Sequence, residues 1–159
     1  MQTPTSDDRG QNKAERALKF LLRYIGTMSL LALVAVFMPY QWMDATHRAL
    51  GMGPLPAEPV VGYLARSLSL FYALLGGLLW VLSFDPRRYR VILRYLAGAF
   101  IFFGVVILGV DFVEGMPWFW KLAEGPVVIA FGALTFWCCA KLDDSEELSA
   151  ARREGVSAR

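Results

Sequence analysis

The chain has 159 residues, 56% of them hydrophobic and 19% charged, and its net charge is +2. Soluble domains carry about 25% charged residues, so this composition argues against an ordinary soluble protein, and the small net charge gives no support for nucleic-acid binding. The charges are sparse in four long apolar runs and dense between them. The sequence therefore predicts one all-α domain, an integral membrane four-helix bundle, over residues 18–142.

The first predicted span covers about residues 24–43, where no charge separates Arg23 from Asp44. Residues 1–17 before it are predicted to be a disordered cytoplasmic N-terminus. We interpret the span as a retained membrane helix and not as a signal peptide, because its charged leader is long and no clean small-x-small cleavage site follows.

A polar connection follows, with Pro39 at a predicted helix start and Gly51 at a predicted helix end. A short interfacial helix is expected in this first outer loop. Its predicted apolar side comprises Trp42, Met43, Thr46, Ala49 and Leu50. His47 is the only histidine; we interpret it as an ordinary interfacial residue, with a proton donor as the alternative.

Three further spans are predicted at about residues 60–83, 91–112 and 117–140. The turn "FDPRRYR" separates the second from the third, and "GMPWFW" precedes the fourth with a glycine, a proline and an aromatic belt. Residues 143–159 form a polar cytoplasmic tail, either disordered or an extension of the fourth helix.

Lys and Arg set the predicted orientation. Of the 16 such residues, only Arg48, Arg66 and Lys121 fall in or beside the first and third connections. The positive-inside rule therefore places both termini in the cytoplasm of a multi-pass protein of the cell's inner (plasma) membrane.

Charged residues inside the spans are the main candidates for function. By helical rise, Arg66 lies roughly 9 Å and Glu124 roughly 10 Å below the outer boundary, and Asp111 lies close to it. Arg66 can pair with either carboxylate, while Lys121 can extend outward. The cluster is either a structural ion pair or a ligand pocket, and intramembrane charges favour function by default. The candidate residues are Arg66, Asp111, Glu124, Lys121, His47, Tyr63 and Ser69.

Arg66, Asp111 and Glu124 each lie on a stripe of small or weakly polar residues at helical spacing, which predicts that the stripes face the bundle interior. The stripes are Gly62, Arg66, Ser69, Ala73, Gly76 and Trp80; Ala97, Gly104, Leu108 and Asp111; and Glu124, Val128, Phe131, Thr135 and Cys138.

The adjacent Cys138 and Cys139 are interpreted as packing residues, with a reactive thiol pair as the alternative. No Cys-x-x-Cys motif or Cys/His cluster occurs, so we expect no metal site and no cofactor.

The segments "YLARS…FYALLGG" and "SFDPRRYR", with the helix count and topology, resemble small bacterial four-helix membrane proteins, including the DoxX-like group. The resemblance covers roughly residues 17–142. It implies a bacterial inner-membrane protein and no active-site residue.

Three functions remain open. The first is a non-enzymatic membrane protein that binds a lipid or a protein partner, or a second copy of itself, through an outward-facing polar cluster. The second is a small-molecule or ion transporter or channel subunit, against which stands the lack of a span broken at its midpoint. The third, a membrane enzyme acting on a quinone or lipid, ranks last, because the sequence has no histidine pair for haem and no Cys/His pair.

Overall fold

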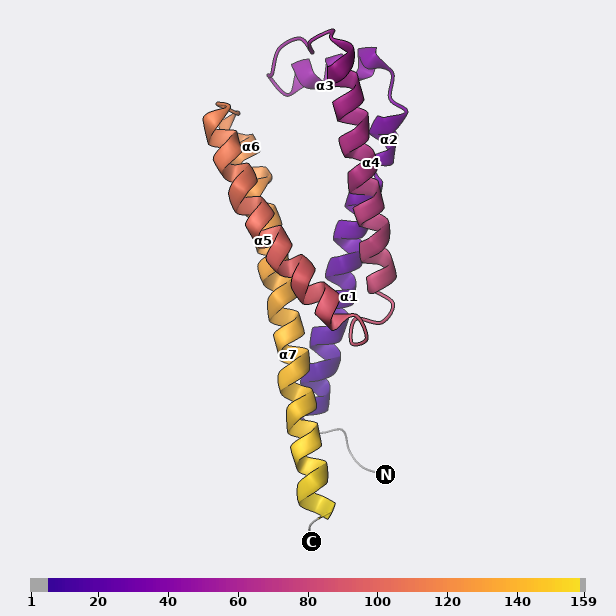
Figure 1. The fold of residues 1–159 in the computed structure, drawn as a ribbon, viewed down its shortest axis with the longest axis vertical. Helices are drawn as coiled ribbons and strands as arrows, with labels where there is room; N and C mark the ends of the chain where they lie inside the picture. Colours follow the sequence, from indigo (N-terminus) through magenta and orange to yellow (C-terminus); the bar gives the residue numbers. More distant parts are fainter. Residues whose placement is uncertain (1–5, 158–159) are drawn as a thin grey trace. The chain divides into compact units, whose positions relative to one another are not determined.

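In a computed structural model, the protein consists of helices and their connections throughout the described backbone, residues 6–157; side chains are described for residues 13–144 (Figure 1). The helices are α1 (Ser6–Leu30), α2 (Leu33–Val36), α3 (Tyr40–Ala49), α4 (Pro59–Leu82), α5 (Arg90–Val113), α6 (Trp118–Ala123) and α7 (Gly125–Ser157).

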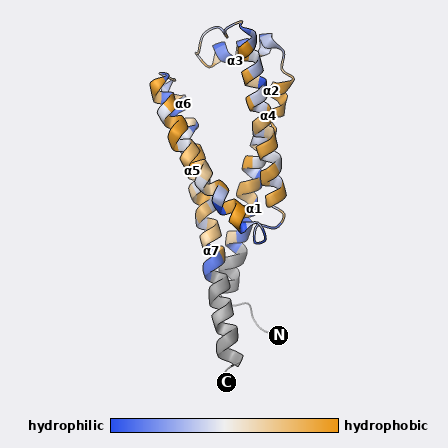
Figure 2. Cartoon of the chain, viewed as in Figure 1, coloured by the Kyte–Doolittle hydropathy of each residue, from blue (hydrophilic) through white to orange (hydrophobic). Residues whose placement is uncertain are grey.

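Four stretches are long and apolar enough to cross a membrane: Lys13–Val36, Pro59–Leu82, Arg90–Val113 and Trp118–Asp144. Apolar residues cover these helices along most of their length (Figure 2). The predicted fold class is confirmed as all-α, with four membrane-spanning helices and the short helix α3 between the first two. The chain is a small multi-pass membrane protein.

The first span differs most from its predicted position, because α1 is helical from Ser6 and the apolar stretch ends at Val36. The helix extends into the charged leader because buried Ala14, Leu18 and Leu22 recur there every fourth residue. Helix α1 ends at Leu30, and α2 continues the span from Leu33 to Val36. The chain does not resume a helix before Pro39, which disfavours helical geometry at Met38. Residues 1–5 and 158–159 lie outside the described backbone.

The chain folds as two compact units, residues 22–81 and residues 1–21 with 82–159. In the first unit, α1 and α4 pack at a glycine contact. A Cβ atom added to Gly76 would lie 2.6 Å from the carbonyl oxygen of Gly26. Nearby, Trp80 Nε1 donates to Thr27 Oγ1 at 3.1 Å, and the Arg23 guanidinium lies 5.3 Å from the centre of the Trp80 ring. Small residues thus let the two helix backbones touch.

In the second unit, α5 packs along α7 through a similar set of contacts. A Cβ on Gly104 would lie 2.8 Å from the Gly125 carbonyl oxygen, and one on Gly132 would lie 2.7 Å from that of Ala97. The buried faces agree with the predicted stripes of the third and fourth spans. The buried members of those stripes are Ala97, Gly104, Asp111, Phe131, Thr135 and Cys138.

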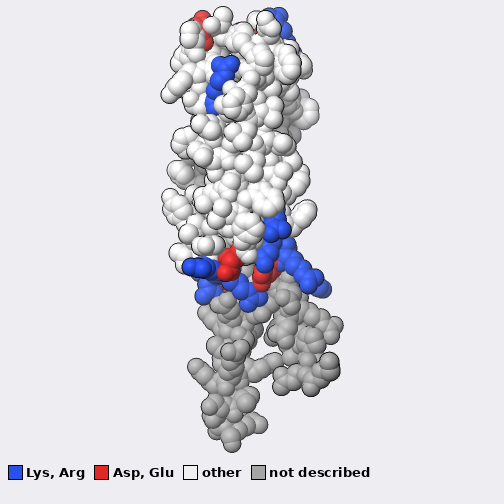
Figure 3. All heavy atoms as spheres, turned by 90° about the vertical axis from the view of Figure 1, so that its right-hand side faces the viewer, with Lys and Arg blue, Asp and Glu red and all other residues white. Residues whose placement is uncertain are grey.

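Ion pairs gather at one end of the second unit. Glu15 accepts from Lys19 Nζ at 2.8 Å and from Arg87 Nε at 2.7 Å. Asp143 pairs with Arg90 and with Arg94. In Figure 3, Lys and Arg side chains (blue) gather with Asp and Glu side chains (red) in one band. Each of these two carboxylates therefore pairs with two basic residues.

Candidate functional site

Arg66 has backbone partners within its own unit. Its Nε donates to the carbonyl oxygen of Val36 and its Nη2 to that of Met38, both at 3.1 Å. Gly62, one turn earlier in α4, leaves room for the side chain, since a Cβ there would lie 3.2 Å from Arg66 Nη1. The first span unwinds between α2 and Pro39, and its last carbonyls have no helical partner. Arg66 supplies their donors, which explains why a charge is tolerated in α4.

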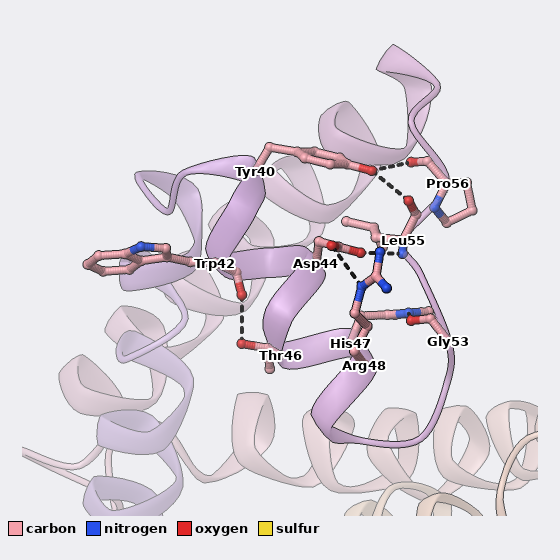
Figure 4. A network of polar contacts seen from close by, with 9 residues as sticks. All are labelled: Tyr40, Trp42, Asp44, Thr46, His47, Arg48, Gly53, Leu55 and Pro56. Atoms are coloured by element: carbon pink, nitrogen blue, oxygen red, sulfur yellow. Dashed lines mark hydrogen bonds and ion pairs between the residues drawn. The ribbon is translucent and has the colours of Figure 1, made fainter.

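The short helix α3 is held by its polar side (Figure 4). Asp44 Oδ1 accepts from the Leu55 backbone nitrogen at 2.7 Å, and Tyr40 Oη donates to the Leu55 carbonyl oxygen at 2.6 Å. His47 Nδ1 lies 2.8 Å from the Gly53 carbonyl oxygen, which can only accept, so the ring nitrogen donates. These bonds fold the returning loop against α3.

The Asp44 carboxylate also pairs with Arg48 Nε at 2.9 Å, one turn along the helix. The bond from the Leu55 nitrogen is the largest cause that lowers the pKa of Asp44 below its ordinary value. Gly51 ends the segment with φ +75°, a left-handed geometry that glycine adopts without strain. The predicted helix between Pro39 and Gly51 is therefore present, and α3 covers Tyr40–Ala49.

The opposite side of α3 is apolar and uncovered. The Trp42 side chain is 65% exposed and points away from the loop (Figure 4). Ala45, Thr46 and Ala49 lie on the same side and are exposed. Thr46 Oγ1 donates to the Trp42 carbonyl oxygen at 2.9 Å, so its hydroxyl is satisfied within the helix. We call Trp42, Ala45, Thr46 and Ala49 the free face of α3.

The fourth span is broken near its predicted outer end. Helix α6 ends at Ala123, and Glu124, with ψ −76°, precedes α7. Pro126 lacks an N–H, so it cannot donate to the Leu122 carbonyl. Trp120 Nε1 donates to Glu124 Oε2 at 2.5 Å and holds that carboxylate beside α6. The fourth span therefore consists of α6 and α7, which are separated at Glu124 because Pro126 interrupts the hydrogen-bond ladder.

Asp111 is only 3% exposed, and its Oδ2 has no hydrogen-bond partner among the described residues. It lies on the face of α5 that packs on the α6–α7 segment. Lys121 Nζ lies 4.6 Å from the centre of the Phe112 ring, and its ammonium makes no ion pair with Asp111. Asp111, Lys121 and Glu124 thus belong to one unit. Glu124 lies at the break, Lys121 precedes it in α6, and Asp111 lies on α5.

The remaining candidates lie elsewhere. Arg66, His47, Tyr63 and Ser69 belong to the unit of residues 22–81, and the Tyr63 side chain is 69% exposed. The pairing of Arg66 with Asp111 or Glu124 stays a prediction. Sequence reasoning missed the two carbonyls that Arg66 binds and the role of Asp44. Pro126 was the available signal for the break, since proline inside a helical pattern interrupts it.

No family model matches the chain, and the comparisons with curated proteins and with solved structures give no match either. The predicted resemblance is therefore supported only at the level of four membrane-spanning helices.

Proposed function

We propose that this is a non-enzymatic membrane protein that binds a phospholipid through the free face of α3. The observation that carries the proposal is the inverted polarity of this helix. Its polar residues Asp44 and His47 bind the protein's own loop, while Trp42 on the other side is uncovered. A surface helix of a soluble domain shows the opposite arrangement.

The membrane interface suits this free face. Tryptophan favours the boundary between headgroups and acyl chains, where its ring is in an apolar layer and its N–H is wet. Ala45 and Ala49 leave a shallow surface beside the Trp42 ring, against which an acyl chain can pack. Arg48, with a side chain 60% exposed, can reach a headgroup phosphate from the edge of the helix.

The proposal includes the location. The distribution of Lys and Arg supports an inner-membrane protein with cytoplasmic termini, so α3 would contact the outer leaflet. The resemblance to DoxX-like proteins supports a bacterial origin at the level of layout only. A protein partner is the alternative occupant of the free face.

Native mass spectrometry of detergent-purified protein, titrated with dioleoyl phosphatidylglycerol, tests the proposal. We expect Trp42→Ala to retain less lipid than the wild type. The matched control is Trp118→Ala, which removes a tryptophan that is 74% exposed at the start of α6. Equal loss in both variants would show general aromatic contact with lipid and would refute a site at α3.

A second candidate function, transport of a small ion, is favoured by the break between α6 and α7. Broken membrane helices often provide ion sites, because their free backbone groups face a substrate. Counterflow measured in proteoliposomes tests transport directly. Ion uptake by the wild type that Asp111→Asn abolishes would support transport. Uptake equal to that of empty vesicles would contradict transport.

A further inference from the structure

We propose that the break between α6 and α7, together with Asp111, forms a binding site for a small monovalent cation such as Na⁺. This inference extends the second candidate function, but it concerns equilibrium binding and does not require transport. It is independent of lipid binding at α3.

The break leaves acceptors without donors. Glu124 N donates to the Trp120 carbonyl oxygen at 3.0 Å, and Val128 N donates to that of Glu124 at 3.1 Å. Between these bonds, the carbonyl oxygens of Lys121, Leu122 and Ala123 accept no hydrogen bond within the described part of the chain. A backbone acceptor without a partner is costly in a membrane span, because lipid offers no donor.

Asp111 adds a second, independent observation. Its Oδ2 is buried without a donor, whereas buried polar atoms in proteins almost always have a partner. Asp111 shares the buried face of α5 with Gly104, which contacts Gly125 at the start of α7. Helical rise carries Asp111 about 10 Å beyond Gly104 in the direction of α6. The position of Lys121 over the adjacent Phe112 agrees with this placement.

The kind of ligand follows from the atoms and charges. Carboxylate and carbonyl oxygens are hard ligands, which suit alkali and alkaline-earth cations. The ionisable groups around the break are Asp111 and Glu124, which are acidic, and Lys121, which is basic. If all three are ionised, one negative charge remains uncompensated, which matches one monovalent cation. We name Asp111 Oδ2 and the three free carbonyls as its ligands.

The test measures thermal unfolding of the full-length protein in detergent, with NaCl replacing choline chloride at constant ionic strength. We expect Na⁺ to raise the unfolding temperature of the wild type, because a ligand that binds only the folded state stabilises it. Asp111→Asn should raise the half-saturating Na⁺ concentration by about tenfold or more, a loss that even indirect partners of a metal can cause. Glu114→Gln, which alters an exposed carboxylate just beyond α5, should match the wild type.

Pro126→Ala provides a variant that repairs the break. The new N–H can donate to the Leu122 carbonyl, so the variant should fold and lose most of its response to Na⁺. Equal unfolding temperatures of the wild type in NaCl, KCl and choline chloride would overturn the proposal. An unchanged response to Na⁺ in both Asp111→Asn and Pro126→Ala would overturn it as well.

Discussion

Arg66 Nε donates to the carbonyl oxygen of Val36 across 30 positions of sequence, at 3.1 Å. The charged side chain of one span thus completes the hydrogen bonding at the end of another. Arg66→Leu leaves the Val36 and Met38 carbonyls without these donors, which should cost about 1–3 kcal/mol for each acceptor that stays buried. Arg66→Lys should lose less stability than Arg66→Leu, because the lysine ammonium can still reach one of the two carbonyl oxygens. Denaturant unfolding in mixed micelles measures both variants.

The predicted ion pair of Arg66 can be tested in the same series. If Arg66 acts through the carbonyls alone, the losses from Arg66→Leu and Asp111→Leu should be additive. Recovery of stability in the double variant would reveal a pair with Asp111, and the same cycle with Glu124→Leu examines the other partner.

Replacing each of two neighbouring glycines in α4 by alanine should have different effects on stability. Gly76→Ala places a Cβ 2.6 Å from the Gly26 carbonyl oxygen, whereas a Cβ at Gly77 meets nothing within 4 Å. Gly76→Ala should force α1 and α4 apart and lower stability by about 1–3 kcal/mol. Gly77→Ala should be neutral or slightly stabilising, because alanine favours the helix more than glycine does. Equal unfolding temperatures for the two variants would contradict the helix contact.

The loop beside α3 should loosen in acid. The hydrogen bond from Leu55 lowers the folded-state pKa of Asp44 below its ordinary value, so the contribution of Asp44 to stability is fully present above the unfolded-state pKa. That contribution is lost as the pH falls through the lower, folded-state value. Asp44→Asn should remove this pH dependence, and amide hydrogen exchange at Leu55 between about pH 2 and about pH 5, a range that includes a lowered aspartate pKa, can detect it. Exchange at Leu55 that responds equally to pH in both proteins would argue against the Asp44 bond.

Membrane orientation is a further prediction. In a background with Cys138→Ala and Cys139→Ala, the new thiol of Arg88→Cys should react only with reagents that cross the membrane. The thiol of Ala57→Cys should react with reagents added outside the cell. Both follow from the distribution of Lys and Arg. If an impermeant maleimide labels Arg88→Cys in intact cells, the topology is the reverse of the one predicted.

The sequence was most informative where one periodicity dominates. The stripe from Ala97 to Asp111 was predicted because small residues at helical spacing mark membrane helix contacts, and its members Ala97, Gly104 and Asp111 are buried. The start of α1 was less predictable, because a search for uncharged runs overlooks an amphipathic helix such as the one around Leu18. The partners of Arg66 could not be predicted, because backbone carbonyls carry no sequence signal.

The most direct test of the lipid-binding account measures what touches the free face of α3. A nitroxide attached at Ala45→Cys, in the background without native cysteines, can be examined by power-saturation electron paramagnetic resonance in liposomes. We predict that this label collides with membrane-dissolved oxygen more than with an aqueous nickel chelate, and that a label at Ala57→Cys, in the exposed loop, shows the reverse. If the label at position 45 is as accessible to the nickel chelate as the label at position 57, α3 does not lie against lipid and the account is wrong.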